Sequence, residues 1–224
     1  KSGRSMRSFE SFIVSYAFML QKYTKFCIYP KKAVILQHKL KNVGKMSVHV
    51  QNSRMTTTRL RKMKQAGEKI AMLTSYDYTL TRLLDEAGIE MILVGDSASN
   101  IVCGNRYTLP ITVEEMIFLT KGVVRAAEHA LVVIDMPFGS YQVSEEQAVS
   151  NALKMMKEAG ADAVKLEGGE EILPAIRHMV QAGVPVMGHL GLTPQSVNPL
   201  GGYGLRAKED AEAEKLLNDA KLLD

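Results

Sequence analysis

Residues 91–97 read Met-Ile-Leu-Val-Gly-Asp-Ser, a short apolar run that ends in a carboxylate and a hydroxyl. The same design recurs as Leu-Val-Val-Ile-Asp at 131–135 and as Ala-Val-Lys-Leu-Glu at 163–167. Nearly continuous apolar runs of this length are typical of strands that are covered on both faces of a parallel sheet. We therefore expect three parallel strands whose polar residues meet at the carboxyl-terminal edge of one sheet.

Short apolar runs alternate with segments of helical period from Ile70 onward, which predicts a series of strand and helix units. The expected strands are Ile70–Tyr76, Met91–Gly95, Leu131–Ile134, Ala163–Leu166 and Val184–Gly188. Capping boxes, in which a hydroxyl and a carboxylate or amide satisfy the first N–H groups of a helix, are predicted at Thr112–Glu115 and Ser144–Gln147. Left-handed helix ends are predicted at Gly88, Gly160 and Gly183.

A polar residue stands at the end of every expected strand: Asp77, Asp96, Asp135, Glu167 and His189. In a (β/α)8 barrel the functional groups come from the carboxyl ends of several strands, whereas a doubly wound sheet usually gathers them at one switch point. This pattern favours an α/β fold of the (β/α)8, or TIM-barrel, type. The final segment, Glu209–Leu223, has a helical pattern, so we expect the chain to contain about five of the eight units of a barrel, truncated after them.

The distribution of charge divides the chain into two predicted parts. Residues 1–54 contain eleven Lys or Arg and a single acid, whereas residues 55–224 contain seventeen Lys or Arg and twenty-three acids. We expect 1–54 to be a basic extension that is disordered or not native to the protein, and 55–224 to be part of a catalytic barrel domain. An organelle transit peptide is the less favoured alternative for 1–54. The two cysteines lack the spacing of a zinc site or of a disulfide framework.

Three acids, Asp96, Asp135 and Glu167, each follow an apolar run that should be buried. A buried carboxylate needs a partner, and for any one of them alone a helix cap or a buried ion pair would suffice. Three carboxylates at the same end of neighbouring strands favour a shared metal ion instead. Because all of these ligands are oxygens, Mg²⁺ is expected before Ca²⁺, and Zn²⁺ would normally require His or Cys.

Polar residues beside these acids predict a site for an anionic substrate. Lys165 lies two residues before Glu167, so both side chains leave the same face of the strand and the lysine can neutralise a substrate carboxylate. The alternative for Lys165 is a structural salt bridge. Ser97 can hydrogen-bond the substrate or only form a turn, and His189 can approach the substrate or be structural. The glycine-rich residues 201–204 are expected to form a lid or loop.

Mg²⁺ next to a lysine suits one class of substrate, the 2-oxo acids. The carboxylate and keto oxygens of such an acid can chelate the ion, and chelation would stabilise an enolate. The expected reaction is therefore the formation or cleavage of a carbon–carbon bond beside a carbonyl group.

Six stretches of residues 55–224 match one enzyme family in the same order. They are Leu-Thr-Ser-Tyr-Asp-Tyr at 73–78, MILVGDS at 91–97, TLPIT at 108–112, DMPF at 135–138, VKLEGG at 164–169 and GHLGLTPQSVN at 188–198. Through these motifs the chain resembles the ketopantoate hydroxymethyltransferases of pantothenate biosynthesis. The resemblance implies a (β/α)8 barrel of the phosphoenolpyruvate/pyruvate-like type. It also implies transfer of a hydroxymethyl group from 5,10-methylenetetrahydrofolate to 3-methyl-2-oxobutanoate, which gives 2-dehydropantoate.

Carried over by motif, the resemblance implies that Asp96, Asp135 and Glu167 coordinate Mg²⁺. The implied contacts to the oxo acid come from Asp96, Ser97, Asp135, Lys165 and His189. The family's proton-abstracting glutamate belongs to a strand that would follow residue 224, so no catalytic base is assigned here and we expect negligible turnover from this chain alone.

The partners follow from the same resemblance, whereas a reducing compartment is the default for two cysteines without disulfide spacing. The implied partners are a small-molecule oxo acid, a folate and further copies of the chain, since family members are large homo-oligomers, commonly decamers. We expect a cytoplasmic protein that binds neither a membrane nor a nucleic acid.

Two alternative functions stay open. A related Mg²⁺-dependent lyase or aldolase acting on oxo acids would share the enolate chemistry. A catalytically inactive chain whose basic residues 1–54 bind nucleic acid or an anionic membrane would account for the charge asymmetry.

Overall fold

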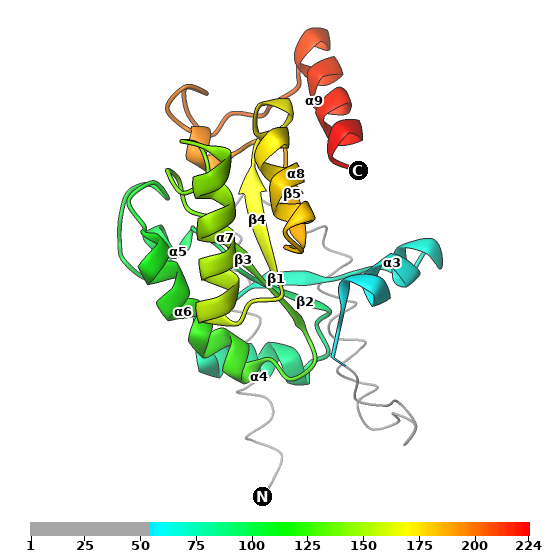
Figure 1. Ribbon diagram of the computed structural model, residues 1–224, viewed down its shortest axis with the longest axis vertical. Coiled ribbons are helices and arrows are strands. Elements are labelled where there is room, and N and C mark those ends of the chain that lie inside the picture. Colours follow the sequence, from blue (N-terminus) through cyan, green and yellow to red (C-terminus); the bar gives the residue numbers. More distant parts are fainter. Residues whose placement is uncertain (1–53) are drawn as a thin grey trace, which may run out of the picture. The chain divides into compact units, whose positions relative to one another are not determined.

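The computed structural model describes residues 54–224, and these lie in one compact unit (Figure 1). The predicted basic extension, residues 1–54, lies outside the described residues except for Arg54, so the proposed boundary between extension and barrel stays a prediction. Among residues 54–224, no helix combines the length and the apolar character that a membrane crossing requires.

Within residues 54–224, five parallel strands form a single sheet in the order in which they occur along the chain. They are β1 (Met72–Thr74), β2 (Met91–Val94), β3 (Leu131–Asp135), β4 (Ala163–Glu167) and β5 (Val186–His189). All five predicted strands are confirmed. β1 is shorter than predicted at both ends, and β5 begins two residues later and ends one residue later than predicted. Among the described residues each of them pairs with one neighbour. Within the described residues the strand order never reverses, whereas a doubly wound sheet reverses at its switch point.

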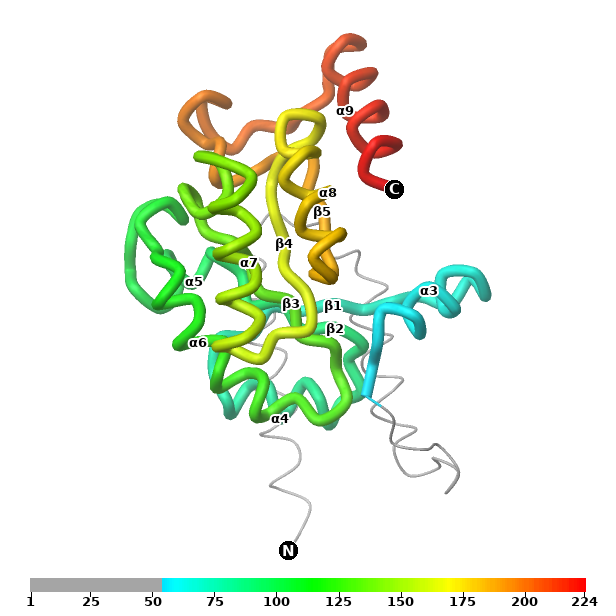
Figure 2. The backbone as a smooth tube through the Cα atoms, in the orientation of Figure 1, coloured from blue at the N-terminus to red at the C-terminus, as the bar shows by residue number. Residues whose placement is uncertain are grey.

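Helices connect the strands and lie outside the sheet. They are α3 (Thr57–Gln65), α4 (Tyr78–Glu86), α5 (Ala98–Ile101), α6 (Val113–Ala126), α7 (Glu145–Ala159), α8 (Leu173–Gln181) and α9 (Asp210–Leu223), with 3-10 turns η2 (Glu170–Ile172) and η3 (Pro194–Ser196). Helices α4, α6, α7 and α8 pack next to one another in that order (Figures 1 and 2). The predicted final helix is confirmed as α9, with Glu209 at its N-cap.

The predicted helix boundaries are confirmed, with one difference in detail. The capping box at Thr112 is complete, because the Thr112 side chain accepts from the Glu115 N–H and the Glu115 side chain accepts from the Thr112 N–H. The Ser144 side chain accepts from the Gln147 N–H, but the reciprocal bond from the Ser144 N–H to the Gln147 side chain is not formed, so the capping box predicted here is only half present. Helix α7 ends at Gly160, whose φ of 80° is left-handed.

The two faces of the sheet have different surroundings. Side chains at alternate positions, among them Ile92, Ile134 and Leu166, are fully buried in the main hydrophobic core beneath the helices. The opposite, inner face carries a smaller apolar cluster near the amino-terminal ends of the strands: Met55, Met91, Leu131, Val133 and Ala163. Farther along the same face the apolar side chains give way to charged ones, so the inner face at the carboxyl end of the sheet is the place to look for a site.

Candidate metal and oxo-acid site

Neighbouring strands place the predicted site residues on the inner face. Asp135 is paired in register with Lys165, and Glu167 with His189. Because side chains alternate along a strand, Asp135, Lys165 and Glu167 share the face that carries Val133 and Ala163 farther back. Their exposed fractions are only 3%, 7% and 7%.

Asp96 joins this group from the turn that follows β2. Its side chain is 4% exposed, and its backbone N–H donates to Asp135 Oδ2 at 3.0 Å. The three predicted metal ligands therefore lie together, and the prediction that they share one end of the sheet is confirmed. Asp77, the polar residue after β1, behaves differently. It is exposed and caps α4 by accepting from the Leu80 N–H at 2.9 Å.

One oxygen of each buried carboxylate is held by an uncharged N–H donor. Asp135 Oδ2 accepts from the Asp96 backbone. Asp96 Oδ2 accepts from the Gln195 side-chain amide nitrogen at 2.9 Å, and Glu167 Oε2 accepts from the Gln195 backbone N–H at 2.9 Å. These bonds fix the orientation of all three carboxyl groups.

The second oxygen of each carboxylate is bound differently. Asp135 Oδ1 lies 2.5 Å from Lys165 Nζ and has no other polar partner among the described residues. Glu167 Oε1 lies 3.2 Å from His189 Nδ1. Asp96 Oδ1 accepts no hydrogen bond from the described residues. The second oxygens of Asp135 and Glu167 therefore lie beside Lys165 and His189, and that of Asp96 has no donor among the described residues.

The electrostatics of the group favour binding of a further positive charge. Burial, followed by the negative charges of Asp135 and Glu167, raises the pKa of Asp96 to about 7. Burial alone would lower the pKa of Lys165, but the neighbouring Asp135 carboxylate raises it above its ordinary value, so the side chain is an ammonium. One ammonium faces three carboxylates, and the excess negative charge is poorly solvated.

The donor set fits a hard divalent cation in type and in charge, because Mg²⁺ prefers carboxylate oxygens. Among residues 54–224, however, no three His, Cys, Asp or Glu side chains are arranged so that they could hold a metal ion as they stand. Asp135 is turned to Lys165, and the other two acids are held by Gln195. The chemistry of the site therefore fits the ion, while its side chains are engaged with protein donors.

Hydroxyl groups border the acids near β2. The Tyr76 hydroxyl and Ser97 Oγ lie 2.7 Å apart. Gly95 lies beneath them, and a Cβ at this position would stand 2.8 Å from Ser97 Oγ and 3.4 Å from Asp135 Oδ2. A glycine is needed here because Ser97 and Asp135 approach the backbone so closely.

Three residues of the site were not predicted from the sequence. Gln195 and Tyr76 lie in the quoted family motifs, which imply no role for them, and Tyr141 lies outside those motifs. The Tyr141 hydroxyl donates to Gln195 Oε1 at 2.7 Å and accepts from the Glu167 N–H at 3.2 Å. The sequence signal for Tyr141 is its position in the loop that follows Asp135, the polar residue at the end of β3.

The glycine-rich loop predicted at residues 201–204 has neither helix nor strand. Tyr203 in this loop is half exposed. Burial, and then the charges of Tyr107, Asp96 and Glu167, raise its pKa, so its hydroxyl lies within electrostatic reach of the acids.

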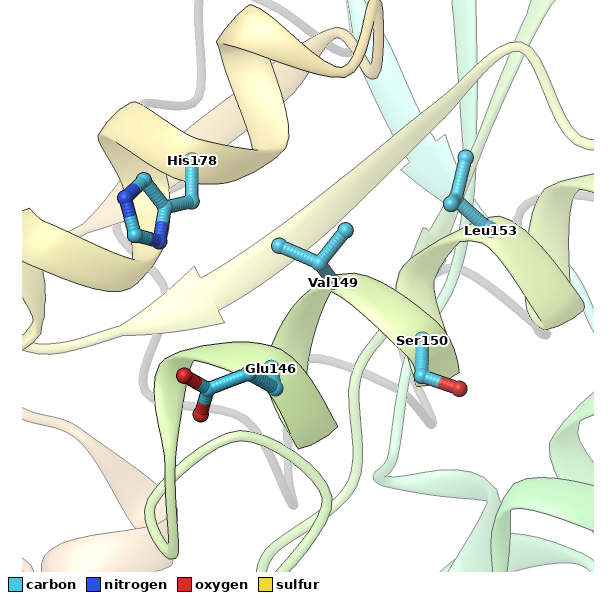
Figure 3. Close-up of a pocket in the computed structure, with 5 residues that line it drawn as sticks. All are labelled: Glu146, Val149, Ser150, Leu153 and His178. Atoms are coloured by element: carbon cyan, nitrogen blue, oxygen red, sulfur yellow. The ribbon is translucent and has the colours of Figure 1, made fainter.

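A separate hollow of about 520 Å³ lies on the outer side of the sheet between α7 and α8. It is lined by Glu146, Val149, Ser150, Leu153 and His178 (Figure 3). None of the predicted site residues lines it, so it is no candidate for the oxo-acid site.

Comparisons with known proteins give the family and the fold. The family model described as ketopantoate hydroxymethyltransferase matches residues 54–224. The 3-methyl-2-oxobutanoate hydroxymethyltransferases of Bacteroides fragilis and Phocaeicola vulgatus are each 60% identical over 171 residues, and that of Flavobacterium johnsoniae is 57% identical. In each case the match covers 76% of this chain and 63% of the relative, so the chain spans less than two thirds of these relatives.

Solved structures with the same fold are more distant in sequence. A phosphonopyruvate hydrolase in complex with oxalate and Mg²⁺ matches with a TM-score of 0.56 at 12% identity, over 75% of this chain and 59% of that one. A 2,3-dimethylmalate lyase of the PEP mutase/isocitrate lyase superfamily matches with a TM-score of 0.52 at 15% identity, over 75% and 59%. With the strand order, these likenesses confirm the predicted fold class: the five strand and helix units are part of a TIM-type barrel.

Proposed function

We propose, from the premise that this chain belongs to the ketopantoate hydroxymethyltransferase family, that it carries the oxo-acid and metal site of an enzyme that hydroxymethylates 3-methyl-2-oxobutanoate. The product would be 2-dehydropantoate, an intermediate of pantothenate biosynthesis. The hydroxymethyl donor would be 5,10-methylenetetrahydrofolate. The observation that carries the proposal is the group of three buried carboxylates beside one ammonium at the carboxyl end of the sheet.

Asp96, Asp135 and Glu167 would hold Mg²⁺. When bound, the ion would supply Lewis-acid polarisation of the keto group of the substrate. The excess negative charge of the three acids supports this assignment. Burial, and then repulsion from Asp135 and Glu167, raises the pKa of Asp96, and a divalent cation would offset both effects.

Residues beside the acids would bind and orient the oxo acid. Lys165 is an ammonium in a nearly dry site, so it would neutralise the substrate carboxylate. Ser97 Oγ, itself bonded to the Tyr76 hydroxyl, would donate a hydrogen bond to the substrate. Asp96 and Asp135 would lie against the substrate as well as the ion, and His189, held by Glu167, would border it.

Further parts of the proposal rest on family membership. The protein would be cytoplasmic, assemble as a homo-oligomer, and act on an oxo acid and a folate without binding a membrane or a nucleic acid. None of the described acids is proposed as the base that removes the substrate proton, because the three buried acids at the carboxyl end of the sheet are assigned to the cation.

Binding of the oxo acid is the direct test, since the described residues would themselves carry it out. We expect calorimetry to detect binding of 3-methyl-2-oxobutanoate in the presence of Mg²⁺ and to lose it when the ion is chelated. Asp135→Asn should abolish this Mg²⁺-dependent binding. Asp162→Asn is the matched control, because Asp162 stands at the opposite end of the strands and accepts from the Val132 N–H.

Two outcomes would count against the proposal. Binding that is equal with and without Mg²⁺ would remove the metal from the site. Release of tetrahydrofolate should be assayed beside cleavage of other oxo acids, because cleavage without any release would assign the chain to the lyase chemistry instead.

A further inference from the structure

Gln195 is a buried amide that lies between two of the proposed metal ligands. It occupies the short 3-10 turn η3 after β5 and is 5% exposed. Its backbone N–H donates to Glu167, which ends β4, and its side chain donates to Asp96, which follows β2. One residue therefore spans two acids that lie 71 positions apart in the sequence.

The orientation of the amide is determined by its partners. The nitrogen Nε2 faces two acceptors, Asp96 Oδ2 at 2.9 Å and the Met136 carbonyl oxygen at 2.9 Å. The oxygen Oε1 faces two donors, the Tyr141 hydroxyl at 2.7 Å and Gln142 Nε2 at 3.3 Å. A flipped amide would place its oxygen against the Asp96 carboxylate, so only one orientation satisfies all four groups.

This orientation excludes Gln195 as a metal ligand. Its nitrogen is a donor with no lone pair to offer, and its oxygen is already shared by two donors. Each acid that it touches keeps one oxygen away from Gln195: Oδ1 of Asp96 and Oε1 of Glu167. The side-chain amide holds one oxygen of Asp96 and the backbone N–H holds one oxygen of Glu167, so Gln195 sets the direction of the other oxygen of each carboxylate.

We propose that Gln195, locked by Tyr141, is a positioning residue that sets the spacing and orientation of Asp96 and Glu167 for the cation. This inference rests on the proposed function, because it concerns the same metal site. Partners that orient metal ligands in this way typically change metal affinity by about 10- to 100-fold when they are removed.

The test measures the affinity of the whole 224-residue chain for Mn²⁺, used as a spectroscopic probe for Mg²⁺ and followed by electron paramagnetic resonance. Gln195→Met keeps most of the side-chain volume but removes both hydrogen-bonding ends. We expect it to weaken Mn²⁺ binding by about 10- to 100-fold. Gln181→Met, the same change at an exposed position at the end of α8, should leave the affinity unchanged.

Thermal unfolding without divalent cations separates positioning from a merely structural role. A structural role would lower the melting temperature and leave the Mn²⁺ affinity of the folded protein unchanged, which would overturn the inference. Tyr141→Phe is the second variant, in case Gln195→Met does not fold. It removes only the hydroxyl that locks Oε1, so it should weaken Mn²⁺ binding in the same direction and by less.

The failures of the two proposals can be told apart. If the wild-type chain binds Mn²⁺ and both variants bind it equally well, the positioning role of Gln195 is wrong and the metal site stands. If the wild-type chain binds no Mn²⁺, the metal site itself is wrong, and the inference falls with it.

Discussion

Acidic side chains stand at both ends of the central strands, and the two ends hold them in opposite ways. The amino-end acids, Asp85, Glu90 and Asp162, each accept from a backbone N–H at or just before the start of a strand. The carboxyl-end acids, Asp96, Asp135 and Glu167, crowd together around one lysine. Burial is similar for Asp85 and Asp96, at 5% and 4% exposed, so burial alone does not separate a structural acid from a functional one.

Hydrogen bonding makes the difference. Asp85 accepts from the backbone N–H groups of Glu128, His129 and Ala130 and pairs with His129 Nδ1 at 2.8 Å. Burial would raise its pKa, but these donors lower it below the ordinary value, whereas the pKa of Asp96 is raised. A carboxylate that is fully satisfied stabilises the fold, and one that lacks donors is available for a ligand.

Removing an amino-end acid should have the largest effect on stability. We expect Asp85→Ala to lower the free energy of unfolding by about 3 kcal/mol, because three backbone N–H groups, two of them partly buried and one buried, lose their acceptor. Urea denaturation measures this change. The affinity of the folded variant for Mn²⁺ should not change. A loss of affinity would mean that an amino-end acid also contributes to the cation site, which would contradict the comparison.

A divalent cation should stabilise the protein only through the carboxyl-end acids. At a concentration 100 times its dissociation constant, Mg²⁺ should stabilise the wild-type chain by about 2.7 kcal/mol. Asp135→Asn should lose this stabilisation and Asp162→Asn should keep it, as measured by thermal unfolding with and without the ion. Equal stabilisation of both variants would place the cation elsewhere.

The two ends should respond to pH with opposite signs. Because the pKa of Asp96 is raised when folded, its contribution to stability is full below the ordinary value near 4 and is lost as the pH rises through about 7. Without divalent cations, Asp96→Asn should therefore be more stable than the wild type at pH 8, by an amount on the order of 2 kcal/mol.

The pKa of Asp85 is lowered when folded, so its contribution is present above the ordinary value and is lost as the pH falls through the lowered one. Asp85→Asn should flatten the acid limb of the stability profile. Denaturation series from pH 3 to pH 8 test both signs together, and a change on the same limb in both variants would contradict the assignment.

Asp77 tests whether every acid at a carboxyl end is functional. It is an exposed helix cap, so Asp77→Ala should cost about 1 kcal/mol of unfolding free energy, the usual value for a lost N-cap. The affinity for Mn²⁺ should stay at the wild-type value. A weakened affinity would extend the site to β1.

The smallest effect is expected at Arg54, whose guanidinium lies 2.9 Å from Asp162 Oδ2. Both side chains are partly exposed, so Arg54→Gln should cost no more than about 0.5 kcal/mol in chemical denaturation. A larger cost would mean that Asp162 stabilises the protein mainly through its ion pair with Arg54 and not through the hydrogen bond that it accepts from the Val132 N–H of β3.

Much of the site could be predicted because its acids stand at the ends of apolar runs that are recognisable as strands. Asp135, Lys165 and Glu167 follow from apolar runs and from the period of two along a strand. The family motifs added roles to Ser97 and His189. Gln195 could not be assigned in the same way, because its partner Tyr141 is 54 positions away and no local pattern links an amide to a hydroxyl across that distance.

The structure also bears on an alternative that the sequence left open for Lys165. This residue forms a salt bridge with Asp135, which was the alternative to its substrate role. That ion pair is compatible with the proposed role, because the ammonium stays charged beside the acids.

The sequence by itself determined the strand and helix series and the end of the sheet at which the acids gather, since apolar periodicity and helix caps are local properties of the chain. Tertiary structure alone decided which oxygen of each acid is held and which is left for a ligand. Those assignments depend on donors that reach the acids from other loops, and their positions are set only when the strands are side by side. The physical reason is that the role of a buried carboxylate, structural or ligand-binding, depends on its hydrogen-bond donors. These donors are distant in sequence and come near the carboxylate only in the folded protein.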